Sequence, residues 1–161
     1  MYVIFKPIQN RIDMAYIKYF ISVPYSVEQM FNLVNDINSY TKFLPGCNVS
    51  KILEKNNNEL IAEMNIVSNG IVRSLITHNF FINNKSISIL LVKGPFKSFY
   101  GYWEFIPITS TVSRIEYSSH YEFKSIFIEK IFNHIFKNKY KNIITAFISR
   151  AHVIYGTYRI L

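Results

Sequence analysis

Hydrophobic and polar residues alternate along the middle of the chain with the period of β-strands that bury one face. The alternating segments follow Gly46 and are separated by turn residues, among them the pair Asn69 and Gly70. Asn-Gly favours tight hairpins because both residues tolerate a positive φ. The pattern predicts six antiparallel strands, at residues 47–55, 59–67, 71–82, 86–92, 98–108 and 112–123.

The segment before these strands predicts one more strand and two short helices. Ala15–Val23 is mostly apolar and aromatic and lacks a helical period, which suits a first strand. Ser26 and Gln29 have the spacing of a capping box at the start of a helix. Asp36 is placed to cap a second short helix, which ends before Pro45.

Residues 125–153 place apolar side chains at steps of three or four, the period of an amphipathic helix. Such a helix is long enough to cross the sheet and cover its apolar face. The predicted fold class is therefore α+β: a curved seven-stranded antiparallel sheet wrapped around a long C-terminal helix, with two short helices after the first strand. In the strand at 71–82 we expect the face toward this helix to carry Val72, Ile76, Phe80 and Ile82.

Length and composition fit one domain with a sizeable core, since the chain has 161 residues and 50% of them are hydrophobic. We expect this domain at residues 15–157, after a weakly structured N-terminal extension at 1–14. The single cysteine, Cys47, excludes an intrachain disulfide and a multi-cysteine zinc site. No apolar run reaches the roughly 18 residues of a membrane span, and we expect a cytoplasmic protein.

Several short motifs resemble, in order and spacing, the RatA family of bacterial ribosome association toxins. The resemblance runs from about residue 15 to residue 156. One departure is visible, because Thr41 follows Tyr40 where the family often has proline. The motifs are Val23-Pro24-Tyr25-Ser26, Glu28-Gln29-Met30, Leu33-Val34-Asn35-Asp36, Phe43-Leu44-Pro45-Gly46-Cys47, Gly94-Pro95-Phe96-Lys97, Gly101-Tyr102-Trp103-Glu104-Phe105, and Ala146-Phe147 with Arg150-Ala151 and Tyr155-Gly156.

The RatA family belongs to the START-like, helix-grip superfamily, together with mitochondrial coenzyme Q-binding proteins and polyketide cyclase-like domains. The resemblance implies a non-enzymatic protein that binds the large ribosomal subunit and inhibits its association with the small one, a toxin-like inhibition of translation. The alternative is a ubiquinone- or lipid-binding chaperone that supports cellular respiration. Neither requires a cofactor, although ubiquinone or another prenyl lipid is an expected ligand.

A curved sheet that grips a helix incompletely leaves an apolar pocket between them. Phe43, Leu44 and Pro45 connect the second helix to a strand, and they form either a rigid lip of this pocket or a plain connection. Trp103 and Phe105 share one strand face. They are either core residues or a pocket wall, with space for a ligand left beside Trp103 by Gly101. Phe147, on the long helix, is expected to complete the pocket.

His78 lies on the apolar face of its strand by parity, between Ile76 and Phe80. It is either a core histidine with a satisfied hydrogen bond or a donor to a ligand carbonyl, and we include it among the pocket residues. The four histidines show no metal-ligand spacing, so no metal is expected. The sequence also lacks a nucleophile elbow, a phosphate loop and a paired-carboxylate motif, which argues against an enzyme.

Positive charge predominates, with 18 Lys and Arg against 10 Asp and Glu. On a helix of about 100° per residue, a basic stripe of Lys130, His134, Lys137 and Lys141 lies opposite the apolar face. The stripe is either a solvated helix surface or a contact for ribosomal RNA phosphates. A third alternative is peripheral contact with anionic lipid head groups. We expect the protein to be a monomer.

Overall fold

The computed structural model describes residues 2–5, 15–68, 70–133 and 140–156. Within them, strands and helices follow one another in the order predicted for an α+β domain. The elements are β1 (Tyr2–Phe5), β2 (Ala15–Val23), α1 (Val27–Asn35), the 3-10 helix η1 (Ile37–Lys42), β3 (Cys47–Lys55), β4 (Glu59–Ser68), β5 (Ile71–Ile82), β6 (Ser86–Lys93), β7 (Phe96–Pro107), β8 (Ser113–Phe123), α2 (Ile126–Asn133) and α3 (Tyr140–Tyr155).

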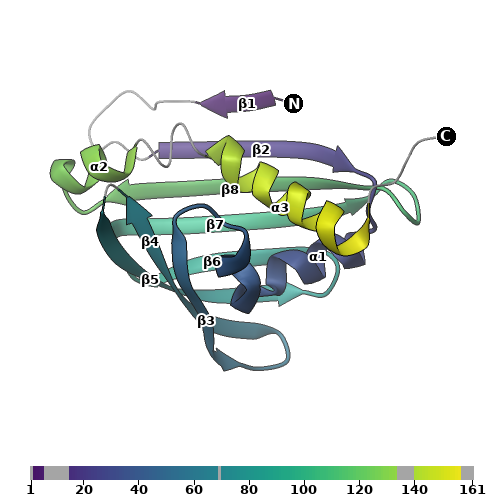
Figure 1. The fold of residues 1–161 in the computed structure, drawn as a ribbon, viewed down its shortest axis with the longest axis horizontal. Coiled ribbons are helices and arrows are strands. Elements are labelled where there is room, and N and C mark those ends of the chain that lie inside the picture. The colour runs from purple at the N-terminus through teal and green to yellow at the C-terminus, as the bar shows by residue number, and fades with distance from the viewer. Residues whose placement is uncertain (1, 6–14, 69, 134–139, 157–161) are drawn as a thin grey trace.

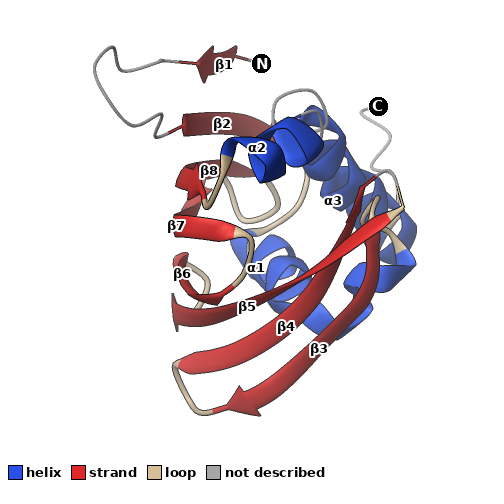
Figure 2. Cartoon of the chain, turned by 90° about the vertical axis from the view of Figure 1, so that its left-hand side faces the viewer, coloured by secondary structure: helices blue, strands red, loops and turns tan. Residues whose placement is uncertain are grey.

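The strands form one antiparallel sheet in the order β1-β2-β8-β7-β6-β5-β4-β3. The sheet is strongly curved, and α1 and α3 lie within its concave side (Figures 1 and 2). The seven predicted strands are confirmed as β2–β8, which gives the predicted helix-grip arrangement. Tyr2–Phe5, in the segment expected to be weakly structured, pairs with β2 as a short edge strand. Residues 6–14 lie outside the described residues.

The two short helices after β2 are confirmed as α1 and η1. The capping box is complete, because the Gln29 backbone N–H donates to Ser26 Oγ at 3.2 Å and the Ser26 N–H donates to Gln29 Oε1 at 2.9 Å. The second helix differs from expectation in its cap, since the Asp36 side chain makes no capping hydrogen bond. Instead the Tyr40 hydroxyl donates to the carbonyl oxygen of Val34 and ties η1 back to α1.

Of the long helix expected over residues 125–153, the structure describes two helical segments, α2 and α3. α2 lies at one end of the sheet and α3 crosses its middle, and residues 134–139 between them lie outside the described residues (Figure 1). The apolar side of α3 packs on the sheet as predicted, with Ile144, Phe147 and Ala151 at most 4% exposed. None of the helices among the described residues has the length and apolarity needed to cross a bilayer.

The face of β5 that points into the molecule is the opposite of the predicted one. Leu75, Thr77, Asn79 and Phe81 are buried, whereas Val72, Ile76, Phe80 and Ile82 point to the outer side. The outer face of β5 carries several apolar residues, whereas the buried part of the inner face includes the polar residues Thr77 and Asn79. The number of apolar positions therefore predicted the wrong face as the buried one. Because side chains alternate between the two faces of a strand, an error in the predicted face reverses the inward or outward assignment of every residue in the strand.

One half of the concave side is filled by aromatic and aliphatic side chains of α1. Met30, Phe31, Leu33 and Val34 are all buried. The Phe31 ring lies 6.0 Å from the ring of Phe81 and 5.7 Å from that of Phe105, in edge-to-face geometry. α1 therefore closes the end of the sheet where β2 finishes, and it leaves the other half to α3 and the segment between η1 and β3.

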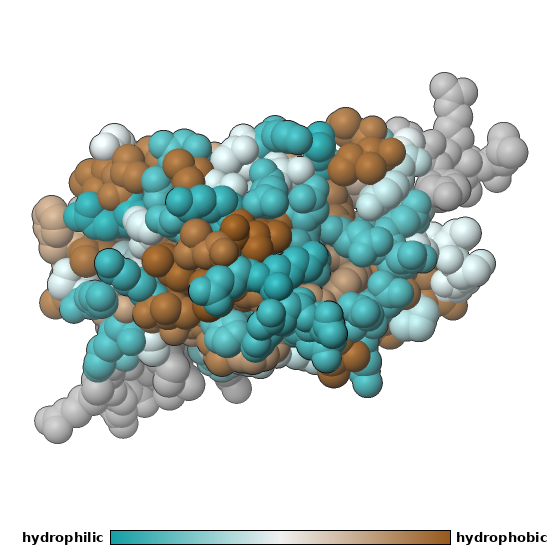
Figure 3. Space-filling model, turned by 90° about the horizontal axis from the view of Figure 1, so that it is seen from below, coloured by the Kyte–Doolittle hydropathy of each residue, from teal (hydrophilic) through white to brown (hydrophobic). Residues whose placement is uncertain are grey.

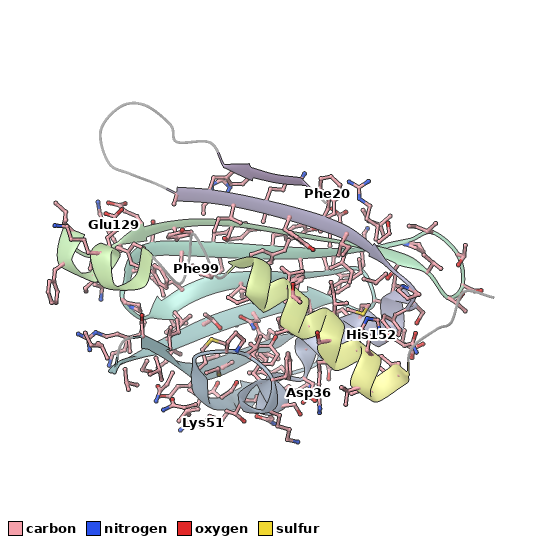
Figure 4. All side chains as sticks on the ribbon, turned by 45° about the horizontal axis from the view of Figure 1, so that its top comes forward. Phe20, Asp36, Lys51, Phe99, Glu129 and His152 are labelled. Carbon is pink, nitrogen blue, oxygen red and sulfur yellow. The ribbon has the colours of Figure 1, made fainter. Side chains whose placement is uncertain are left out.

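The C-terminal end of α3 is tied to the start of α1. The buried Tyr25 hydroxyl donates to the carbonyl oxygen of Gly156 at 2.9 Å and is hydrogen-bonded to Nδ1 of His152. The Tyr155 hydroxyl donates to the Gln29 carbonyl oxygen at 3.0 Å. Figure 4 shows His152 on the last turns of α3, beside α1. These contacts fix the position of α3 across the sheet.

Candidate functional site

A cavity of about 160 Å³ lies between α3 and the concave face of the sheet. Cys47 and Ile66 are opposite each other on β3 and β4, and both line it. Phe99, near the start of β7, lines it as well and lies between α2 and the start of α3 (Figure 4). The cavity thus occupies the half of the concave side that α1 does not fill.

Trp103 forms part of the cavity wall and is held by aromatic neighbours. Its side chain lies 4.6 Å from the Tyr117 ring and 5.4 Å from the Phe147 ring, measured between centroids. Trp103 is 6% exposed, so this part of the wall is almost fully shielded from bulk solvent. Leu44 and Pro45, from the segment between η1 and β3, face the same space.

Four of the predicted pocket residues therefore line the cavity: Leu44, Pro45, Trp103 and Phe147. Phe43 and Phe105 lie one layer behind them. The Phe43 ring packs 5.2 Å from that of Phe147, and the Phe105 ring is stacked with that of Trp103 at 6.4 Å. These two side chains set the positions of the residues that line the wall.

The space expected beside Gly101 is occupied. A Cβ atom at Gly101 would lie 3.2 Å from the Tyr117 hydroxyl and 3.4 Å from the Ile89 side chain. The missing side chain makes room for these two neighbours, so the hollow does not arise from Gly101. It lies between η1, α3 and the curved sheet.

His78 does not belong to the cavity, and its prediction as a pocket residue is wrong. It lies on the outer face of β5, with Nε2 3.0 Å from Oε2 of Glu59 and its ring 4.1 Å from that of Phe80. Hydrogen bonds from Asn56 and His78 lower the pKa of Glu59. The reason for the error is the parity of β5, which turns the neighbours of His78 inward.

Those neighbours, Thr77 and Asn79, are polar residues of the cavity that the sequence analysis did not predict. They are 8% and 5% exposed, and both line the hollow. Asn79 Oδ1 has no hydrogen-bond partner among the described residues. The signal was present in the sequence, because Leu75 and Phe81 share their parity and would have marked this side as the buried one.

The cavity is uncharged. None of its lining side chains among the described residues is Asp, Glu, Lys, Arg or His. Burial raises the pKa of the Cys47 thiol, whose Sγ donates to the Val49 carbonyl oxygen at 3.4 Å. Burial also raises the pKa of the Tyr40 hydroxyl. The site can therefore hold a neutral, mainly apolar molecule, and none of its described lining side chains carries a charge.

Only one member of the predicted basic stripe can be placed. Lys130 is exposed on α2, whereas His134, Lys137 and the side chain of Lys141 lie outside what the structure describes. Other exposed cations gather at the same end of the sheet, where β6 and β8 finish and β7 begins: Lys93, Lys97 and Lys124. Of these, Lys97 pairs with Glu122 at 2.8 Å.

The outer face of the sheet is mixed in character. It carries exposed apolar side chains, among them Leu53, Val72 and Phe80. Figure 3 shows hydrophobic and hydrophilic residues side by side over the surface seen from below. Charged residues on the outer face are largely paired, as in the contact of Lys51 with Glu63 at 3.0 Å.

Known proteins share both the sequence and the fold. The family model described as polyketide cyclase / dehydrase and lipid transport matches residues 23–148. The chain is 42% identical over 134 residues to the ribosome association toxin RatA of Escherichia coli, which covers 83% of this chain and 85% of that protein. It is 26% identical over 136 residues to the mitochondrial coenzyme Q-binding protein COQ10 homolog B of Xenopus laevis, over 82% of this chain and 56% of that one.

Among solved structures, an aromatase/cyclase from Streptomyces matches with a TM-score of 0.78 and 10% identity, over 90% of this chain and 99% of that chain. At this identity the likeness shows the fold alone. The sequence relatives go further, because the family model spans most of the chain. The chain therefore belongs to the START-like family of polyketide cyclase, dehydrase and lipid transport proteins, with the ribosome association toxins as its relatives.

Proposed function

We propose that this protein binds the large ribosomal subunit and hinders its association with the small subunit, without catalysing a reaction. The observation that carries the proposal is the 42% identity to a ribosome association toxin over 83% of the chain. A role at the ribosome places the protein in the cytoplasm.

The distribution of charge supports an RNA partner. Lys93, Lys124 and Lys130 are exposed at one end of the sheet. Together with Lys51, Lys93 helps to lower the pKa of Glu63, whereas no ion pair is recorded for Lys124 or Lys130 in the part of the chain that the structure describes. Lysine side chains that neutralise phosphates release counterions, so binding through them weakens as salt rises. The uncharged cavity supports the non-enzymatic part of the proposal, since none of its described lining residues is Asp, Glu, Lys or His, the side chains that most often act as general acids or bases.

Purified ribosomal subunits provide the test. Added wild-type protein should reduce the coupled ribosome peak in a sucrose gradient and increase both subunit peaks. The double variant Lys124→Glu with Lys130→Glu should lose most of this effect. The matched control, Lys55→Glu with Lys85→Glu, changes the charge equally on exposed lysines at the opposite end of the sheet and should retain it. Unchanged subunit association with the wild-type protein at low salt would refute the proposal.

A second candidate function is binding of a quinone or another prenyl lipid. The apolar cavity of about 160 Å³ favours it, as does the likeness to a coenzyme Q-binding protein. A cavity of roughly 150 Å³ lined by apolar side chains holds a single benzene ring, so a prenyl chain would have to leave through the mouth. Quenching of Trp103 fluorescence by added short-chain ubiquinone would support this function, and the absence of both quenching and co-purified lipid would exclude it.

A further inference from the structure

Asn79 places an unpartnered polar group in an otherwise apolar wall. Its side chain is 5% exposed and lines the cavity, and Oδ1 has no hydrogen-bond partner among the described residues. Buried polar groups in folded proteins nearly always have a partner, because leaving one unpaired costs the full desolvation penalty. An orphan acceptor on a side chain that lines a cavity is therefore a position where a ligand can supply the missing donor.

The described residues around Asn79 provide no recorded hydrogen-bond donor to its Oδ1 atom, so a ligand can be that donor. In register, Asn79 lies between Leu60 on β4 and Ile89 on β6, and neither side chain can hydrogen-bond. The other polar side chains of the wall with recorded partners are engaged elsewhere: the Tyr40 hydroxyl donates to Val34 and the Cys47 thiol donates to Val49. Thr77, two residues away on the same face, is the nearest polar neighbour along the strand.

The chemistry of the wall restricts the kind of ligand. A carboxylate or phosphate would be buried without a cation, since none of the described lining residues carries a charge. A purely apolar ligand would leave Asn79 Oδ1 unpaired. A neutral hydroxyl group satisfies both conditions, because it donates one hydrogen bond and brings no charge. The volume of about 160 Å³ limits the buried part of the ligand to one ring.

We propose that Asn79 is a specificity-determining residue that accepts a hydrogen bond from the hydroxyl group of a ring-sized, otherwise apolar ligand of the phenol or hydroquinone class. The proposal rests on the second candidate function, the binding of a ligand in this cavity. A site built to pair with a hydroxyl rejects the analogue that lacks it, since that analogue leaves the acceptor buried and unpaired.

Two probes of nearly the same shape test the proposal. 4-Methylphenol and p-xylene differ by one hydroxyl in place of one methyl group. Their binding to the full chain can be followed through Trp103, which is the single tryptophan of the sequence and lines the cavity. We expect the wild type to bind 4-methylphenol about tenfold more tightly than p-xylene, the ratio that one net hydrogen bond supplies.

Asn79→Leu removes the amide at similar size and should abolish or reverse this preference. Asn65→Leu, the same substitution at an outward-facing position of β4, is the matched control and should keep the wild-type ratio. Asn79→Ser retains an acceptor and should keep part of the preference, which provides a second test if the leucine variant fails to fold.

An unchanged ratio in the folded Asn79→Leu variant would overturn the role of Asn79 alone. If that variant does not fold, an unchanged ratio in Asn79→Ser would do so. Equal affinity of the wild type for the two probes would do the same while leaving the cavity as a ligand site. Failure of the wild type to bind either probe would overturn the inference together with the second candidate function. None of these results bears on ribosome binding, which the gradient experiment tests separately.

Discussion

Tyr25 is the residue that most directly connects the two ends of the domain. It is fully buried, and its hydroxyl reaches both Gly156 and His152 at the end of α3. These contacts join positions that are 127 and 131 residues apart in the sequence. The position of α3 over the cavity therefore depends on a side chain at the end of the first long strand.

Replacing Tyr25 by Phe should lower the free energy of unfolding by about 1–2 kcal/mol, because the Gly156 carbonyl loses its donor and the His152 contact is lost in a buried site. Urea denaturation measures this change. Tyr100→Phe is the matched control, since the Tyr100 side chain is 38% exposed, and it should have little effect. Equal stability of the two variants would show that the Tyr25 hydroxyl does not hold α3.

Cys47 should react slowly with alkylating reagents in the folded protein. Burial raises the pKa of its thiol, so at a given pH near neutrality a smaller fraction is the reactive thiolate than in the unfolded chain. The rate of iodoacetamide labelling at pH 7.5 should be several-fold lower than in urea and should rise with pH. Labelling that is faster in the folded state would contradict the neutral character assigned to this part of the cavity.

At the level of residues, the sequence identified the aromatic side of the cavity and missed the polar side. Trp103 and Phe147 could be predicted as buried residues, because aromatic side chains in a strand and on the apolar stripe of an amphipathic helix are expected to be buried. Asn79 was not, since a polar residue between apolar ones on a strand is normally assigned to solvent. Its shared parity with Leu75 and Phe81 marks it as buried, but only the tertiary packing shows that it lines a hollow.

At the level of elements, β5 is the strand on which the structure and the sequence pattern disagree. Turn residues marked the strand boundaries well, because Asn-Gly and Gly-Pro restrict the backbone locally. The facing of a strand depends on what packs against it, and the outer face of β5 is unusually apolar. The helix expected over residues 125–153 is described as α2 and α3, and residues 134–139 lie outside the described residues.

A pair of adjacent phenylalanines on β5 tests the observed facing. Phe81 is 7% exposed and packs against Phe31, whereas Phe80 is 39% exposed on the outer face. Phe81→Ala should cost about 3–5 kcal/mol of unfolding free energy, as is typical for a buried ring, and Phe80→Ala much less. Thermal or urea unfolding of the two variants measures the difference. A larger loss for Phe80→Ala would mean that the strand faces the other way.

The start of α1 offers a second test among the elements. Ser26→Ala removes the acceptor for the Gln29 backbone N–H and should cost about 1 kcal/mol in unfolding free energy. Ser98→Ala, at an exposed strand position of β7, is the control and should be close to neutral. An equal effect of the two substitutions in urea denaturation would argue that the capping box does not stabilise α1.

For the whole molecule, the fold separates two properties that a binding protein can use independently. The curved sheet and α3 enclose a neutral, nearly apolar cavity, while exposed lysines gather near α2 at one end of the sheet. Ionised side chains lie on the surface and not in the described cavity wall, because burying an unpaired charge is energetically costly. A ligand in the cavity would contact α3 directly, through Phe147 and Ile144.

The most direct measurement of the central claim is sedimentation of the purified protein with isolated ribosomal subunits at several salt concentrations. We predict that the protein sediments with the large subunit and not with the small one, and that the bound fraction falls steeply as salt increases. Sedimentation with both subunits alike, or with neither at low salt, would contradict the account.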